Sequence, residues 1–201
     1  MTAQSERRGR RGRPYSGFLP WLVFILVARL DEGDVRWAAL AALGAAVLLS
    51  LPSIRARSVK ILEIGGIALF AAFALFAFTA SPAHAALLTR YGRAISLAAL
   101  ALIAFASLLV MPFTEQYARE AVPPAFWEAP LFRRANVVLT TAWGFVFLIM
   151  SVSHVVARQM GTRRAHVIFD WIVPIAAVLI AIRLMAAYRG RLGARISARR
   201  R

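Results

Sequence analysis

Long apolar stretches alternate with short polar segments along this chain. Five stretches of about 18 or more mostly apolar residues follow a shorter one, and a helix that spans a membrane needs about 20. None alternates apolar and polar residues as the strand of a membrane barrel does, and a helix satisfies its own backbone hydrogen bonds in lipid. The pattern predicts an all-α, polytopic bundle of about six transmembrane helices. The expected segments are residues 18–30, 37–51 with their flanks, 61–80, 94–111, 136–157 and 166–188.

Composition supports a single membrane domain. Of the 201 residues 60% are hydrophobic, and the mean hydropathy is +0.66, whereas a soluble domain keeps its apolar share near one half. We expect a transmembrane domain at residues 18–188 between basic cytoplasmic tails at residues 1–17 and 189–201. The first segment would make only about 20 Å of helix. It is therefore expected either to borrow length from residues 14–17 or to be re-entrant.

The net charge of +16 predicts membrane topology rather than nucleic-acid binding. Eleven of the 25 lysines and arginines lie in the two tails, where basic residues set orientation and contact anionic lipid headgroups. Counted on alternate sides of the six segments, 17 basic residues lie on the side of the two termini and 7 on the other. This bias predicts that both termini are cytoplasmic.

The segment at residues 112–134 mixes aromatic and charged residues with four prolines. Its aromatic rings suit headgroup depth, and the prolines interrupt any long helix. Anchoring at the membrane interface is the simpler interpretation, and a docking surface for another membrane or cytoplasmic protein is the alternative. The candidate partner contacts are Phe126, Trp127, Arg133, Arg134 and Asn136.

A resemblance to a known family starts in this segment. The residues that carry it are Val122, Pro123, Phe126 and Trp127, then Phe132, Arg133, Arg134 and Asn136, then Trp143, Val146 and Phe147. Their order resembles the intracellular septation protein A (YciB-like) family of bacterial inner membranes. The resemblance implies a multi-pass protein of the cell inner membrane with a non-catalytic role in envelope integrity, septation and cell division. Division-complex proteins and lipids would be its partners.

Three ionisable residues inside the predicted spans are further candidates, because such groups are costly in lipid and often functional. Glu63 lies close to Lys60, which favours an interfacial ion pair. His154 lies in the fifth segment and Asp170 about one turn into the sixth. The turn between these segments is short, so Asp170 can meet His154 or Arg158 near the outer face. A structural bridge is favoured over a proton relay.

The sequence contains no motif that predicts an enzyme. The absence of cysteine excludes thiolate catalysis, and the three histidines follow no recognised metal-ligand spacing. His154 and His166 are not expected to face each other at matching depth, as a haem would require. We therefore expect no enzyme activity, cofactor or metal site. Two hypotheses stand: a non-catalytic envelope protein that acts by contact, and a small oligomeric transporter or channel that uses Asp170 and His154.

Overall fold

The computed structural model describes residues 16–30 and 35–199, and within them the side chains of residues 17–28 and 35–187. Helices and short connections make up this part of the chain, which contains no strand, so the predicted all-α class is confirmed. Residues 1–15 of the predicted N-terminal tail, together with Arg200 and Arg201, lie outside the described residues. Most of the predicted C-terminal tail continues the last helix.

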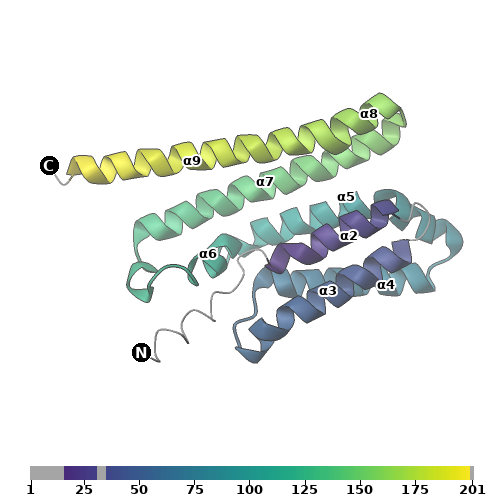
Figure 1. The fold of residues 1–201 in the computed structure, drawn as a ribbon, viewed down its shortest axis with the longest axis horizontal. Coiled ribbons are helices and arrows are strands. Elements are labelled where there is room, and N and C mark those ends of the chain that lie inside the picture. Colours follow the sequence, from purple (N-terminus) through teal and green to yellow (C-terminus); the bar gives the residue numbers. More distant parts are fainter. Residues whose placement is uncertain (1–15, 31–34, 200–201) are drawn as a thin grey trace.

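The long helices lie side by side, with α7 and α9 on one side of the bundle and α2, α3 and α4 on the other (Figure 1). The elements are the 3₁₀ turn η1 (Ser16–Phe18), α2 (Leu19–Leu30), α3 (Val35–Arg55), α4 (Ile61–Thr79), α5 (Pro82–Ser107), α6 (Phe113–Ala118), the 3₁₀ turn η2 (Pro124–Phe126), α7 (Pro130–Met160), α8 (Arg163–Val167), the π-helical turn η3 (Ile168–Ile172) and α9 (Val173–Arg199).

Five helical segments are long and apolar enough to cross a membrane. They are Val35–Arg55, Ile61–Thr79, Pro82–Ser107, Pro130–Met160 and the continuous stretch Arg163–Ala187. The first predicted segment forms only the 12-residue α2, which is about 18 Å long at 1.5 Å per residue. By length, the described residues therefore provide five helices that can span a membrane and one shorter apolar helix, rather than six helices of spanning length.

The helix ends explain why some predicted boundaries differ from the structure. Pro82 occupies the first turn of α5, where its missing N–H costs nothing. The polar turns that follow extend α5 well before the apolar run predicted at residues 94–111. Gly161 adopts a left-handed conformation with φ of 61° and ends α7. Hydropathy detects only the apolar part of such helices, so their polar ends were missed.

A core of aromatic rings holds α2 against the bundle. Phe24 is fully buried, and its ring centroid lies 5.4 Å from those of both Phe70 and Phe73 on α4. The ring centroids of Trp21 and Phe70 lie 5.1 Å apart. Small residues of α3 face this core and permit close approach of the backbones; they are Ala38, Ala39, Ala42 and Ala46.

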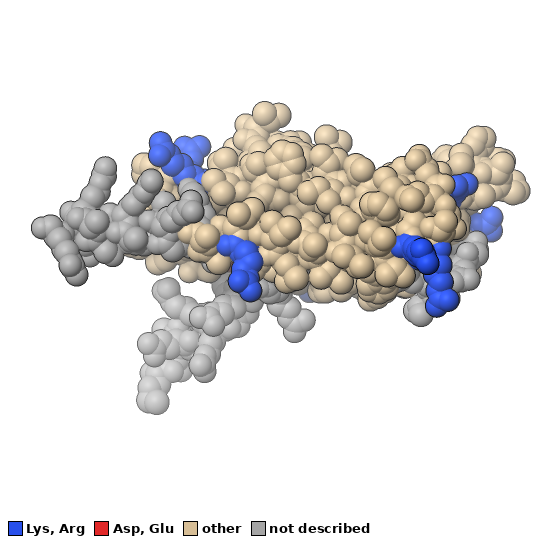
Figure 2. Space-filling model, turned by 90° about the horizontal axis from the view of Figure 1, so that it is seen from above, with Lys and Arg blue, Asp and Glu red and all other residues tan. Residues whose placement is uncertain are grey.

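The outer surface matches a lipid environment. Basic side chains gather toward the two ends of the face in Figure 2, and the middle of that face carries no charged residue. Large apolar side chains are exposed along the spans, including Leu48, Leu75 and Leu102. A soluble monomer rarely exposes so much contiguous apolar surface. The exposed apolar side chains therefore support membrane insertion.

We expect Gly144→Ala to destabilise the contact between α5 and α7. A Cβ atom at Gly144 would lie 2.6 Å from the Phe105 ring, and overpacking of this kind costs about 1–3 kcal/mol. Thermal unfolding in detergent measures the effect. Gly44→Ala is the matched control, because a Cβ atom there meets nothing within 4 Å. Equal unfolding temperatures for the two variants would contradict this packing.

Candidate functional site

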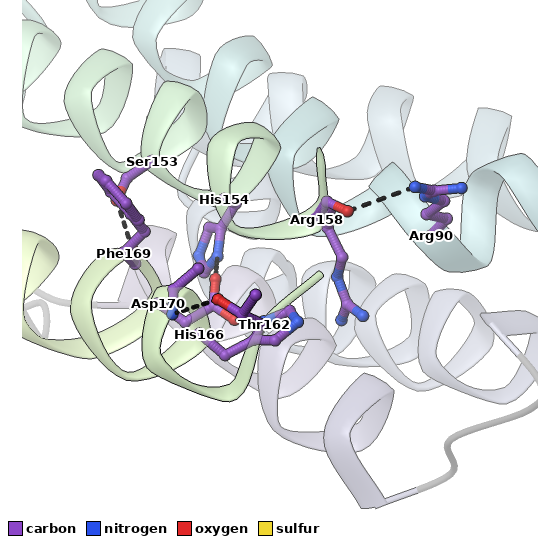
Figure 3. A network of polar contacts seen from close by, with 9 residues as sticks. Arg90, Ser153, His154, Arg158, Thr162, His166, Phe169 and Asp170 are labelled. Atoms are coloured by element: carbon purple, nitrogen blue, oxygen red, sulfur yellow. Dashed lines mark hydrogen bonds and ion pairs between the residues drawn. The ribbon is translucent and has the colours of Figure 1, made fainter. Parts of the chain in front are cut away.

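Two histidines share one carboxylate at the end of the bundle where α7 turns into α8. The Asp170 Oδ1 atom lies 2.5 Å from His154 Nδ1, and Oδ2 lies 2.9 Å from His166 Nδ1 (Figure 3). An ionised carboxylate can only accept, so each imidazole donates its Nδ1–H. The three residues are called the His–Asp–His cluster below.

Local structure positions this cluster. Asp170 lies in the π-helical turn η3, and such turns recur at functional sites because the extra residue per turn redirects side chains. The Ser153 hydroxyl donates to the backbone oxygen of Phe169 and fixes η3 against α7 (Figure 3). The side chains of His154 and Asp170 are only 9% and 7% exposed, whereas that of His166 is 35% exposed. The cluster is therefore buried on the α7 side and open on the α8 side.

A cavity of about 810 Å³ adjoins the cluster, and His166 and Asp170 form part of its wall. This volume falls within the range of ordinary ligand sites. Three arginines also line it, Arg90 and Arg93 from α5 and Arg158 from α7. The apolar part of the wall includes Phe24, Leu88 and Trp171.

The predicted contact between Asp170 and His154 is confirmed, and Arg158 lies beside the same cavity. The expectation that His154 and His166 do not face one another at matching depth is wrong, since both rings meet one carboxylate. The spacing of His166 and Asp170 could have indicated their contact, because residues four apart share a helix face. Among the described residues, no group of three or more histidines and acids is arranged to hold a metal ion.

Glu63 belongs to a different polar cluster at the other end of the bundle. The buried Lys60 Nζ atom lies 2.7 Å from Glu120 Oε1 and 4.0 Å from Glu63 Oε1, so the predicted pairing of Glu63 with Lys60 is confirmed. Glu63 also accepts hydrogen bonds from the Ser53 hydroxyl and the Lys60 N–H. Burial, and to a lesser degree the charges of Glu63 and Glu120, raises the pKa of Tyr117. The ion pair with Lys60 and the hydrogen bonds from Ser53 and the Lys60 N–H explain Glu63 as a structural residue.

The interfacial segment divides into a buried and an exposed part. Phe113, Glu115 and Tyr117 of α6 are buried against the end of the bundle. Phe126 is 58% exposed, while Trp127 is half-buried, with its Nε1–H donating to the Val122 oxygen at 2.9 Å.

The candidate partner contacts do not all lie on the surface. Arg133 and Arg134 are exposed, and they follow Phe126 in the sequence of this segment. Asn136 is 3% exposed, and its amide donates to the Phe132 oxygen of its own helix. It thus lies beneath the surface that a partner would meet.

No family model matches this chain, and the searches of curated proteins and of solved structures give no match either. The resemblance to the septation protein A family stays a prediction. The function is therefore argued from the geometry of the two candidate regions.

Proposed function

We propose that this chain is a small membrane transporter or channel whose solute enters the cavity beside the His–Asp–His cluster. The observation that carries the proposal is the Asp170 carboxylate, which lies in a spanning segment and is shared by two histidines at a cavity wall. Intramembrane ionisable groups are costly, and those that line a cavity commonly serve ion or proton pathways. A purely structural bridge would need no adjoining cavity.

Proton uptake by the cluster supplies the proposed coupling. Histidine is the side chain whose charge most readily changes near physiological pH, and two histidines bond one carboxylate at the wall of this cavity. The charged groups around Asp170 are His154 and Arg158 of α7, His166 of α8 and Arg93 of α5. On α9 the first charged residue is Arg183, far along the helix. A proton added to either ring therefore acts on a compact group of charges.

Few spans surround the cavity, which favours an oligomer. Transporters usually enclose their site between repeats or subunits, whereas here α9 packs mainly against α7 and leaves most of its length exposed. A homo-oligomer would complete the wall around the cavity.

A non-catalytic role in envelope integrity or septation is the second candidate function. The exposed Phe126 ring supports it, because it stands on a proline-rich segment that leads along the chain into the exposed basic pair Arg133 and Arg134. Exposed aromatic and arginine side chains are the types that dominate binding interfaces. With α2 counted as a sixth crossing, this proposal places the protein in the cell inner membrane with both termini cytoplasmic, in contact with division-complex proteins and anionic lipids.

Single-cysteine labelling tests transport, and the chain suits it because it has no native cysteine. Thr89 is exposed and lines the cavity, so Thr89→Cys reports whether water reaches the cavity. We expect a membrane-impermeant maleimide to reach the introduced cysteine from either face of sealed vesicles, in proportions that differ between about pH 5 and about pH 8.

Ser58→Cys is the control for sidedness, because Ser58 is exposed in the loop between α3 and α4, at the opposite end of the bundle (Figure 1). It should react from one face only. Labelling of the Thr89→Cys variant from a single face at both pH values would contradict transport.

A further inference from the structure

The short helix α6 lies near the start of α2, at the end of the bundle opposite α8 and the cavity (Figure 1). Its six residues cannot span a membrane, yet Phe113 is only 2% exposed and Tyr117 only 9%. Chain that does not span is tolerated at membrane depth where protein covers it or where it lines a water-filled path. The position of α6 therefore suits an element that closes a path.

Aromatic side chains connect the cavity to α6 along α2. Phe24 lines the cavity, and Trp21 lies three residues before it on the same face of α2. A further three residues back, the ring of Phe18 contacts those of Phe113 and Tyr117 of α6, with centroids 5.9 Å and 6.5 Å away. Apolar constrictions of this kind exclude water and so gate channels. A passage along these rings is therefore closed, and the last rings that close it belong to α6.

Side-chain hydrogen bonds attach α6 to two neighbouring helices. The hydroxyl oxygens of Thr114 on α6 and Thr140 on α7 lie 2.8 Å apart. The side-chain oxygen of Gln116 accepts a hydrogen bond from the N–H of Ile61, the first residue of α4, at 2.9 Å. Water at the end of the bundle can replace such bonds at a small net cost in free energy. These attachments can therefore break while the long helices stay in place.

The docked position of α6 also leaves one buried polar group unpaired. The Tyr117 hydroxyl has no hydrogen-bond partner among the described residues. It lies against Gly17, where an added Cβ atom would overlap it. A buried hydroxyl without a partner destabilises the state that buries it, and it regains its hydrogen bonds when water reaches it. The docked state of α6 is therefore less stable than its packing alone would make it, which suits an element with two positions.

We propose that α6 is the gate at this end of the proposed transport path, and that its release from Thr140 and Ile61 opens the aromatic passage toward the cavity. Pro112 and Pro123 bound the moving segment, since neither continues a helix. Lids and gating loops move in this way against a fixed scaffold. This inference rests on the proposed function, which requires that the cavity open to both faces of the membrane.

A reversible disulfide in the full-length protein tests the gate, because the chain has no native cysteine. Thr114→Cys with Thr140→Cys places two sulfur atoms where the hydroxyl oxygens lie 2.8 Å apart, close to the about 2.0 Å of a disulfide. In sealed vesicles and the Thr89→Cys background, oxidation should abolish maleimide labelling of the cavity from the face on which Ser58→Cys reacts. Labelling from the other face should remain, and reduction should restore both. Peptide mass spectrometry confirms the bridge and locates the label.

Thr140→Cys alone, in the same Thr89→Cys background, is the matched control, because it removes the same hydroxyl and cannot form the bridge. Oxidation should leave its labelling unchanged. Phe113→Ala is a second variant for the case in which the disulfide does not form. It removes a ring of α6 from the passage and should raise labelling of Thr89→Cys from the Ser58 face.

The gate is overturned if labelling from the Ser58 face survives the bridge, if the bridge abolishes labelling from both faces, or if Phe113→Ala leaves labelling from the Ser58 face unchanged. Labelling of Thr89→Cys from both faces before and after bridge formation would uphold transport and overturn the gate alone. Labelling from a single face before oxidation would contradict transport, and the gate with it.

Discussion

Asp170→Asn should lower the free energy of unfolding by about 2 kcal/mol and change the pH response of the cavity, because it alters the bonds that hold both histidines. The amide keeps the shape of the carboxylate, but it offers one oxygen and one NH₂ group to two histidines that both donate at present. One charge-assisted bond becomes neutral and the other must be lost or remade through another tautomer, which accounts for the estimated cost. Chemical denaturation and Thr89→Cys labelling at about pH 5 and about pH 8 measure the two effects.

Glu128→Gln is the control for this variant, because Glu128 is an exposed carboxylate of the interfacial segment. This variant should change the free energy of unfolding by less than about 0.5 kcal/mol, as expected for a surface substitution. Its labelling at the two pH values should match that of the wild type. An Asp170→Asn protein that is as stable as this control, and that keeps its pH response, would contradict the assigned role of the cluster.

The second large effect is expected at the opposite end of the bundle, where Lys60→Met should cost about 3 kcal/mol of stability. Lys60 is 6% exposed, and its Nζ atom lies 2.7 Å from Glu120 Oε1 and 4.0 Å from Glu63 Oε1. Methionine keeps much of the side-chain volume but removes the charge. The buried Glu63 carboxylate then loses its nearby cation, while the hydrogen bonds from Ser53 and the Lys60 N–H remain. Unfolding in detergent measures the loss.

Arg55→Met is the matched control, since Arg55 is exposed at the end of α3, before the loop that leads to Lys60. This variant removes the same charge from the same end of the bundle and should change stability by less than about 0.5 kcal/mol. Similar losses for both variants would show that net charge, rather than the buried ion pair, stabilises this end.

Hydropathy predicted most of the fold because lipid imposes a simple requirement on each span. The apolar runs at residues 61–80 and 136–157 became α4 and the middle of α7. The same signal could not show that α2 is only 12 residues long or that its Phe24 is fully buried among aromatic rings. These features depend on packing between helices, which single-sequence periodicity does not contain.

The candidate site was predicted in part. The short turn between the last two segments placed Asp170 near His154, which the structure confirms. The cavity was missed because Arg90 and Arg158, 68 residues apart in the chain, were counted as topology signals. Basic residues near span ends serve that role so commonly that their convergence on one cavity becomes visible only in three dimensions.

Complementation of cells that lack the native protein tests the central claim most directly. Two variants are expressed at equal membrane abundance and scored for growth under osmotic stress: Asp170→Asn, and the double variant Phe126→Ala with Trp127→Ala. If the His–Asp–His cluster carries the function, Asp170→Asn fails to complement and the double variant grows normally, because its changes lie in the interfacial segment, away from the cavity wall. Normal growth of Asp170→Asn beside failure of the double variant would contradict transport and favour the contact function.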